Sequence, residues 1–237
     1  MSINKIEILT TKTIDKKLIS LANTYNIFID QIPFIEIKNV ETTDVKKRIT
    51  ALSKQSITAI FTSANAVNAV NAILSRKPQW RVFCIGHKTK TVAEATFGDE
   101  NIVGIADDGQ QLADEIIKYS SEKKMVFFCG NQRRNVLPEK LRKNAIELEE
   151  LVVYQTIEKP RAISKRYDGI LFFSPSGVRS FFSKNTIEQG TQLFAIGSTT
   201  ANDAKTFSNL PVLSAEYPDT ASLINLVIKH FTTVKIF

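Results

Sequence analysis

The chain has 237 residues, of which 43% are hydrophobic, and it carries a formal net charge of +7 from 31 basic and 24 acidic residues. This length leaves room for two domains of ordinary size, and the apolar content is that of a globular protein, which excludes a disordered chain. The basic residues are dispersed in short groups such as Lys46–Arg48, without the aromatic-interleaved stripe of a nucleic-acid surface. Solvated lysines account for most of the excess, and the remainder favours an acidic small molecule over nucleic acid.

The cysteines and the N-terminal run bear on the compartment. Cys84 and Cys129 each close an apolar run and lack CxxC or metal-ligand spacing, which is typical of reduced, buried thiols. Lys5 and Glu7 interrupt the first apolar run, which therefore does not resemble a signal peptide, and no stretch approaches the about 18 apolar residues of a membrane span. We expect a cytoplasmic protein without membrane contact.

Short apolar runs alternate with amphipathic segments along the chain, a pattern that predicts βαβ units and a parallel sheet. The expected strands are Ile6–Leu9, Ile27–Ile32, Ile57–Phe61, Val82–Ile85, Ile102–Ile105, Met125–Cys129, Leu148–Val153, Gly169–Phe173, Leu193–Ile196 and Pro211–Leu213. The expected helices are 12–24, 64–75, 88–96, 109–121, 133–143, 176–184, 199–207 and 220–232. Five strands would then fall to each of two domains, the number in a flavodoxin-like sheet. The apolar end, Thr232–Phe237, is expected to pack as an added strand.

Residues 57–118 and 168–229 carry the same residue pattern 111 positions apart. The coinciding pairs include Phe61/Phe172, Ser63/Ser174, Gly86/Gly197, Thr89/Thr200 and Leu112/Leu223. Residues 5–35 resemble 125–155 at an offset of 120, but they precede the repeat in one copy and follow it in the other. We therefore predict that the chain builds one kind of α/β domain twice.

The order of these segments predicts that the first domain is discontinuous. Residues 1–34 would fold with 158–237, and residues 38–152 would form the second domain. The chain would cross between the domains over 33–39 and over 153–160. The expected architecture is two flavodoxin-like parallel-sheet domains joined by a two-stranded crossover hinge, with a ligand held in the cleft between the copies.

Small polar residues follow the strands at the edge where doubly wound sheets bind ligands. Helices that begin there offer free backbone N–H groups beside hydroxyls and amides, which suits carboxylate or phosphate, although Ser, Thr and Asn also simply cap helices. Several such loops around one cleft favour a multi-anion site. The candidate binding residues are Thr10, Ser63, Ala64, Asn65, Thr89, Gly130, Ser174, Pro175, Ser176, Gly177, Gly197, Ser198, Thr199 and Thr200.

The sequence lacks the usual catalytic apparatus. His87 and His230 are its only histidines, nothing places a serine or cysteine beside either, and no Walker, GxGxxG or metal-ligand pattern is present. His87 is expected as a helix-start residue. Asp107–Asp108 precedes a helix and matches Pro218–Asp219, and this pattern is expected to be N-capping rather than an acid pair. Such a protein either binds a ligand or catalyses by shaping a reactive substrate.

Two further residues stand out. Tyr154 lies at the second crossing, where its phenol could reach a ligand, and a packed ring with a satisfied hydroxyl is the plain alternative. Arg133 follows the end of an expected strand and is a candidate for gripping an anion bidentately, with surface solvation as the alternative.

Taken together, these segments resemble uroporphyrinogen-III synthase, the cyclising enzyme of tetrapyrrole and haem biosynthesis. The resemblance covers nearly the whole chain and rests on Phe61–Val67, Cys84–Gly86, Val153–Thr156, Asp168–Gly177 and Ala195–Ala201. It implies a lyase that closes the linear poly-carboxylate hydroxymethylbilane to a macrocycle, with inversion of the last pyrrole ring and loss of water. It also implies that no metal and no organic cofactor takes part.

The resemblance implies roles for particular residues. Tyr154 matches the tyrosine that assists departure of the substrate hydroxyl by donating a hydrogen bond. The first copy departs from the pattern at Lys90, where the second copy has Ala201. The resemblance therefore implies least about the roles of residues 87–90. The residues that correspond to substrate-contacting positions are Ser63, Ser174, Ser176, Thr199 and Thr200.

The implied partner is the tetrapyrrole substrate, with room for transient contact with the upstream hydroxymethylbilane synthase, and we expect a monomer. A non-catalytic cytosolic receptor for a poly-anionic small molecule is the alternative, because two α/β domains joined by two crossings also describe solute-binding proteins. A nucleic-acid-binding protein is a distant third interpretation, and it would bind with a steep salt dependence.

Overall fold

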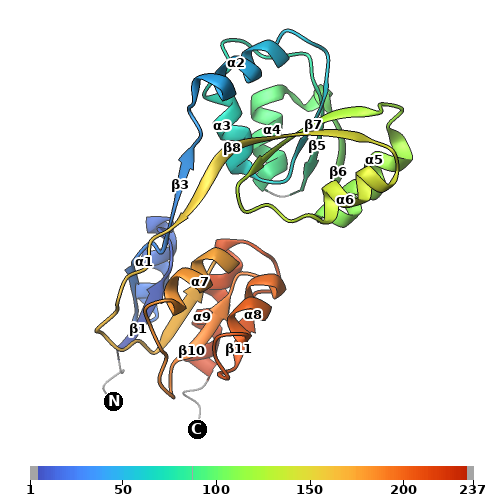
Figure 1. The fold of residues 1–237 in the computed structure, drawn as a ribbon. Helices are drawn as coiled ribbons and strands as arrows, with labels where there is room; N and C mark the ends of the chain where they lie inside the picture. Colours follow the sequence, from blue (N-terminus) through green and yellow to red (C-terminus); the bar gives the residue numbers. More distant parts are fainter. Residues whose placement is uncertain (1–4, 87, 234–237) are drawn as a thin grey trace. The chain divides into compact units, whose positions relative to one another are not determined.

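The structure is a computed structural model that describes residues 5–86 and 88–233 (Figure 1). The chain divides into two compact units: the first unit consists of Met1–Glu36 and Ile157–Phe237, and the second unit of Ile37–Thr156. Both divisions fall inside strands, β3 (Ile35–Asn39) and β8 (Glu147–Glu158), which are hydrogen-bonded neighbours in one sheet. No helix among the described residues is long and apolar enough to cross a membrane.

The first unit contains a five-stranded sheet in the order β2-β1-β9-β10-β11, in which neighbouring strands are parallel. This is the 2-1-3-4-5 order of a flavodoxin-like sheet. Its strands are β1 (Ile6–Thr10), β2 (Ile27–Gln31), β9 (Gly169–Phe172), β10 (Gln192–Ala195) and β11 (Val212–Ser214). Its helices are α1 (Lys16–Thr24), α7 (Pro175–Phe182), α8 (Ser198–Lys205) and α9 (Thr220–Thr233).

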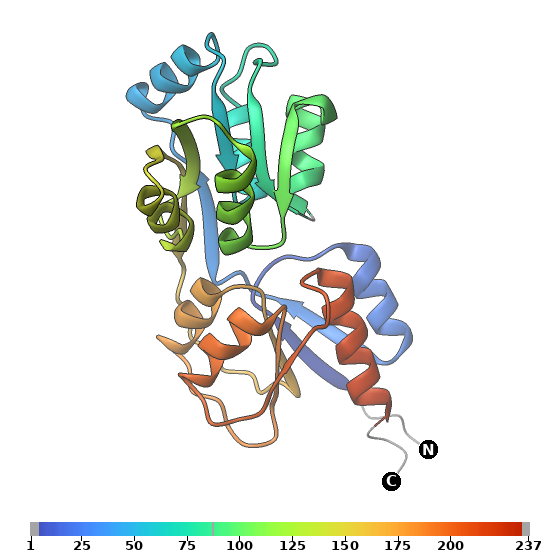
Figure 2. The same ribbon diagram turned by 90° about the vertical axis from the view of Figure 1, so that its right-hand side faces the viewer.

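Helices cover both faces of this sheet. The helices α1 and α9 lie side by side on one face (Figure 2), where Ile8 packs in one cluster with Ala22 and Leu223. On the other face, Leu9 packs with Val178 of α7 and with part of α8. Successive strand residues point to opposite faces, so a strand covered on both sides is a continuous apolar run rather than an alternating one.

The second unit contains a six-stranded sheet in the order β3-β8-β7-β4-β5-β6, in which the neighbouring strands from β8 to β6 are parallel. Its other strands are β4 (Thr58–Phe61), β5 (Arg81–Ile85), β6 (Ile102–Ala106) and β7 (Lys124–Gly130). Its helices are α2 (Thr43–Leu52), α3 (Ala64–Asn71), α4 (Lys88–Phe97), the 3-10 turn η1 (Asp99–Asn101), α5 (Gly109–Tyr119) and α6 (Val136–Lys143). The expected α/β class with two parallel-sheet domains is confirmed.

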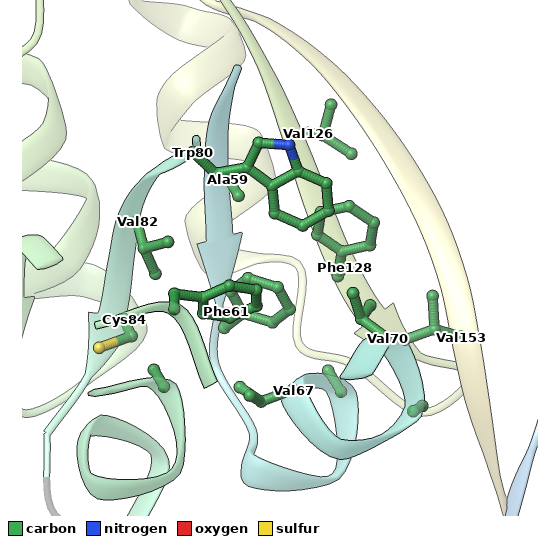
Figure 3. Packing of buried hydrophobic residues seen from close by; sticks show 14 of the residues in the cluster. Ala59, Phe61, Val67, Val70, Trp80, Val82, Cys84, Val126, Phe128 and Val153 are labelled. Carbon is green, nitrogen blue, oxygen red and sulfur yellow. The ribbon is translucent and has the colours of Figure 1, made fainter. Parts of the chain in front are cut away.

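An aromatic stack fills the core between the second sheet and the helices α2, α3 and α4 (Figure 3). The ring of Phe128 stacks on Phe61 with centroids 5.0 Å apart and on Trp80 at 5.3 Å. The buried indole N–H of Trp80 donates to the Leu52 carbonyl oxygen at 3.1 Å, so the polar end of this large ring is satisfied. The same hydrogen bond ties the end of α2 to the sheet.

The internal repeat appears in the elements themselves. Thr58 and Gly169 begin β4 and β9, and Ala64 and Pro175 begin α3 and α7, each pair 111 residues apart. At the offset of 120, α1 corresponds to α6 and β2 to β8. The orders β8-β7-β4-β5-β6 and β2-β1-β9-β10-β11 are therefore equivalent, with the first β-α-β segment of one unit placed last in the other. The predicted duplication is confirmed.

Besides the short 3-10 turn η1, a strand and a helix of the second unit were not expected from the sequence. The strand β3 occupies part of the expected crossover 33–39 and adds a sixth strand, so the predicted count of five is wrong for this sheet. Four of its five residues are exposed, which leaves no apolar run to reveal it. The helix α2 buries only Ile49 and Leu52, and it begins where the Thr42 hydroxyl accepts the Val45 N–H.

Smaller expectations have mixed outcomes. Asp108 and Asp219 are N-caps as predicted, accepting the backbone N–H groups of Gln111 and Ser222. Thr232 and Thr233, the first residues of the added strand expected at Thr232–Phe237, belong to α9 instead. Residues 234–237 and His87 lie outside the described residues.

Both cysteines are buried and free, as predicted. Burial raises the pKa of the Cys84 and Cys129 thiols to about 11, so both are uncharged at neutral pH.

Candidate functional site

In a doubly wound sheet, ligands bind beyond the carboxyl ends of two neighbouring strands whose connections lead toward opposite edges of the sheet. This place is called the topological switch point. In the first unit this switch point lies between β1 and β9, because β1 leads toward β2 and β9 leads toward β10 on the other side. In the second unit it lies between β7 and β4 for the same reason. The segments that follow these strands are Thr11–Lys12, Phe173–Ser174, Asn131–Gln132 and Thr62–Ser63.

Tyr154 lies at the switch point of the second unit because the pairing of β7 with β8 is irregular. Cys129 pairs with Val152, but the next residue, Gly130, pairs with Tyr154, so Val153 is an extra residue in the ladder. Such a bulge redirects side chains. As a result, the consecutive residues Val153 and Tyr154 both pack against the cluster around the aromatic stack.

Gly130 makes room for the Tyr154 ring. A Cβ atom at position 130 would lie 2.4 Å from Cζ and 2.8 Å from the hydroxyl oxygen of Tyr154. Real Cβ atoms do not approach other atoms this closely, so the tyrosine can take this place only beside a glycine. The predicted site residue Gly130 therefore has the structural role of leaving room for this ring.

The phenol of Tyr154 is in an environment that keeps it protonated. Burial raises the pKa of Tyr154 above its ordinary value of 10.0, and a hydrogen bond with the Ser63 hydroxyl opposes the shift. The Ser63 oxygen also accepts the Asn65 N–H at 3.2 Å and so caps α3. The structure thus brings Tyr154, Gly130 and the loop Ser63–Asn65 together.

The loop after β7 holds the strand that carries Tyr154. The Asn131 side-chain oxygen accepts the Thr156 N–H at 2.8 Å, and the Gln132 amide donates to the Thr156 carbonyl oxygen at 3.2 Å. The Asn131 N–H donates to the Tyr154 carbonyl oxygen at 3.2 Å. These bonds fix the backbone on both sides of Gln155, which restricts the directions that the phenol can take.

Arg133 is placed differently from an anion-gripping residue. Its guanidinium forms an ion pair with Glu150, and it donates to the Asn135 side-chain oxygen at 2.6 Å. Arg142 binds the other oxygen of the same Glu150 carboxylate. Arg133 therefore joins α6 to β8, and a ligand anion would have to compete with Glu150 for it.

The switch point of the first unit is lined by hydroxyl groups. The Ser174 oxygen accepts the Gly177 N–H at 3.2 Å at the start of α7 and lies 3.1 Å from the Ser176 oxygen. The Thr11 hydroxyl donates to the Leu171 carbonyl oxygen at 2.8 Å, which joins the ends of β1 and β9. A Cβ atom on Gly177 would meet both the Ser174 and Thr11 hydroxyl oxygens, so these groups converge on one spot.

The start of α8 is open. Its N-cap is Gly197, which makes no side-chain capping bond, and Ser198 and Thr199 are exposed. The first N–H groups of a helix carry partial positive charge and suit an anion. Pro175, which begins α7, is half-buried beside Ser174.

Three of the predicted hydroxyl residues point inward. The side chains of Thr10, Thr89 and Thr200 are almost fully buried, and the Thr10 hydroxyl donates to the Lys12 carbonyl oxygen at 2.8 Å. Thr10 therefore shapes the turn after β1. Ala64 is half-buried at the first position of α3.

Lys12 lies at this edge and was not among the predicted site residues. Its ammonium nitrogen is 4.3 Å from the centroid of the Phe173 ring, the residue that follows β9. The sequence signal that could have identified it is its place, two residues after the first strand, where a single cation interrupts a run of threonines.

A substitution at Ser174 separates helix capping from anion binding. We expect Ser174→Asp to keep the stability of the first unit within about 0.5 kcal/mol, because aspartate caps helices as well as serine does. If the carboxyl edge of the first sheet binds carboxylates of the ligand, the negative charge added at position 174 repels the ligand and raises its KM about tenfold. Urea unfolding and ligand titration measure the two effects, and Thr42→Asp, at the cap of α2, is the matched control. An unchanged KM would leave Ser174 with its capping role alone.

Together these features define a protein of two doubly wound parallel-sheet units, a class whose ligands bind beyond the carboxyl ends of the strands. Residues 26–225 match the family model described as Uroporphyrinogen-III synthase HemD. Because the match spans most of the chain, the chain belongs to this family, and the resemblance seen in the sequence is confirmed.

Solved structures share the fold over nearly the whole chain. A mutant uroporphyrinogen III synthase from the extremely thermophilic bacterium Thermus thermophilus has a TM-score of 0.70 at 11% identity, covering 97% of this chain and 100% of that one. Uroporphyrinogen-III synthetase from Helicobacter pylori has a TM-score of 0.64 at 17% identity, covering 95% of this chain and 99% of that one.

Proposed function

We propose that this chain is an active uroporphyrinogen-III synthase that works as a cytoplasmic monomer. The reaction converts hydroxymethylbilane to uroporphyrinogen III and one molecule of water. The carbon that bears the hydroxyl group becomes bonded to the last pyrrole ring, and that ring is inverted in the product. Membership of the family supports the substrate class, a linear tetrapyrrole with several carboxylates.

The observation that carries the proposal is the place of Tyr154. A protonated phenol at the switch point, held by the bulge and admitted by Gly130, can donate its proton toward a departing hydroxyl. Its pKa is raised by burial, so it remains a donor throughout the neutral range. When the Ser63 hydroxyl donates to the phenol oxygen, the phenol proton is left for the substrate.

The reaction requires little acid–base catalysis from the protein. Loss of the hydroxyl as water leaves an electrophilic azafulvene at one end of the chain. The demanding step is attack from the substituted carbon of the last ring, which gives a spiro intermediate that rearranges to isomer III. A site that folds the linear substrate into this geometry gains its rate from proximity and orientation.

The protein can bind the substrate through the substrate's carboxylates. Helix starts at the carboxyl edge of each sheet supply N–H donors and hydroxyls, including the Ser174 and Ser176 pair and the open start of α8. Hydrogen bonds from such groups to a carboxylate are charge-assisted and stronger than neutral ones. Binding through these groups needs no histidine or metal.

The test couples the protein to hydroxymethylbilane made freshly by its upstream synthase, followed by separation of the uroporphyrin isomers after oxidation. Uncatalysed closure gives isomer I. We expect isomer III to dominate and its rate of formation to rise in proportion to the protein concentration. Heat-unfolded protein at the same concentration is the control.

If folded protein yields only isomer I, the proposal is wrong. Binding of the linear substrate without formation of isomer III would then support a receptor for a poly-anionic molecule.

A further inference from the structure

The strand that carries Tyr154 continues beyond the end of its neighbour. The strand β7 ends at Gly130, whose partner in β8 is Tyr154, whereas β8 runs on to Glu158. The second unit ends within this continuation, at Thr156. The bonds that hold residues 155–156 therefore also hold the backbone from which the phenol projects.

The Asn131 side chain takes the place of a neighbouring strand for Thr156. Its oxygen accepts the Thr156 N–H at 2.8 Å, and its amide nitrogen lies 3.5 Å from the Thr156 carbonyl oxygen. The backbone of a neighbouring strand offers the same two kinds of bond, an acceptor for N–H and a donor for C=O. The Gln132 amide donates to the same carbonyl oxygen at 3.2 Å. Both backbone polar groups of Thr156 are thus bonded to the loop after β7.

The backbone next to the phenol is held from two sides. The Val153 carbonyl oxygen accepts the N–H of Val40, the residue after β3, at 2.9 Å. The Tyr154 carbonyl oxygen accepts the Asn131 N–H at 3.2 Å. With Thr156 bonded as well, the segment is fixed before and after Tyr154, and few backbone conformations remain to it. The Asn131 side chain supplies the bond on the far side.

The equivalent residues of the first unit make different bonds. At the offset of 120, Asn131 corresponds to Thr11 and Tyr154 to Phe34. The Thr11 hydroxyl donates to the Leu171 carbonyl oxygen, so this side chain joins two strands of the sheet. The Phe34 ring is fully buried, and its packing determines its direction. The Tyr154 ring is only partly buried, so its direction depends more on the backbone, and this is the copy that has the amide.

We propose that Asn131 is a positioning residue, whose side-chain amide fixes the backbone after Tyr154 and thereby directs the phenol toward the substrate hydroxyl. The use of the phenol as an acid rests on the proposed function. Asn131 itself takes no part in the bond-forming steps, so the effect of losing its amide passes through Tyr154. A misplaced acid slows the chemical step and leaves the groups that bind the substrate unchanged, so the loss is expected in kcat and not in KM.

The test compares Asn131→Ala and Asn131→Asp with the matched control Asn185→Ala in the first unit. The Asn185 oxygen accepts the Ile163 N–H at 2.8 Å, and its amide donates to the Arg161 carbonyl oxygen at 2.7 Å. We expect Asn131→Ala to lower kcat for isomer III about tenfold with KM unchanged. Asn131→Asp keeps the acceptor for the Thr156 N–H and should retain most of kcat.

Thermal unfolding of the same variants measures the structural part of the effect. Asn185 is less exposed than Asn131, so Asn185→Ala should lower the Tm at least as much as Asn131→Ala does, while keeping the wild-type kcat. An equal loss of kcat in Asn131→Ala and Asn185→Ala would show that the rate follows stability alone, and the inference would be wrong.

The Tyr154→Phe background shows whether the effect passes through the phenol. Without the phenol there is no acid to direct, so adding Asn131→Ala to Tyr154→Phe should change kcat by less than about twofold. A further tenfold loss in this background would overturn the inference.

NMR of the free protein keeps this inference separate from the proposed function. In protein with ¹³C-labelled tyrosine, the ring signals of Tyr154 are those that Tyr154→Phe removes. Asn131→Ala should shift these signals and lower the pKa of the phenol toward its ordinary value of 10.0, because burial of the ring is what raises it. Asn185→Ala should leave both unchanged.

The NMR result decides the inference whether or not the protein is a synthase. Unchanged Tyr154 signals in Asn131→Ala would overturn it even if the wild type forms isomer III. If the wild type forms no isomer III but the signals move, the proposed function is wrong and the positioning of the ring by Asn131 stands.

Discussion

Replacing Tyr154 by phenylalanine is expected to lower kcat by roughly 10²–10⁴-fold, the usual contribution of a positioned general acid. The substitution removes the phenol proton but keeps the ring, which packs against the buried cluster of the second unit. The fold should therefore remain intact. Initial rates of isomer III formation, with circular dichroism and urea unfolding of the same preparations, measure both quantities.

The pH dependence of kcat is a second test of the Tyr154 phenol. In the proposed mechanism the phenol acts in its protonated form, and burial raises its pKa above the ordinary value of 10.0. Activity that depends on this proton is thus present at neutral pH and is lost only as pH rises through the raised pKa. A loss of kcat near pH 7 would point to a different acid.

Tyr167→Phe is a matched control for the loss of a phenol. Its hydroxyl donates to an Asp30 carboxylate oxygen at 2.9 Å, and Tyr167 precedes β9, at the opposite end of that strand from Ser174. This variant should lose some stability and keep its kcat. If Tyr154→Phe turns over at nearly the wild-type rate, Tyr154 is a packing residue and takes no part in the mechanism.

Much of the fold follows from features that the sequence displays locally. Each buried parallel strand is an apolar run bounded by polar loops, and the repeat indicates which runs are equivalent. Two flavodoxin-like units of the same kind could therefore be expected before any contact was known. The strand β3 and helix α2 were not predicted because they bury few side chains. Their places are determined by pairing with β8 and by the contact of Leu52 with Trp80.

The candidate site was predictable in its loops but not in its side-chain partners. Residues after strands were expected at one edge, and the grouping of Ser63 with Tyr154 agrees with that expectation. The pairing of Arg133 with Glu150 depends on how β8 runs beside α6, which a strand pattern does not specify. The contacts of Lys12 with Phe173 and Thr220 likewise join residues that are far apart in the sequence.

Gly130→Ala is expected to destabilise the protein by about 1–3 kcal/mol and to lower kcat about 100-fold, because the added Cβ atom displaces the Tyr154 ring. The three atoms nearest to such a Cβ all belong to Tyr154. Urea unfolding and the rate of isomer III formation give the two effects. Gly109→Ala, where the nearest neighbour of the new atom is the Leu137 Cβ at 3.6 Å, should be close to neutral.

A double-mutant cycle isolates the contact. Because the clash involves one side chain, adding Gly130→Ala to Tyr154→Ala should cost less than about 0.5 kcal/mol, and the coupling between the two positions should exceed about 1 kcal/mol. Equal costs in both backgrounds would mean that Gly130 is required by its own backbone and not by the tyrosine. A large coupling would instead show that the glycine is present to admit the phenol. The bulge at Val153 and the glycine at position 130 would then act together to place the acidic phenol of Tyr154 at the end of the sheet.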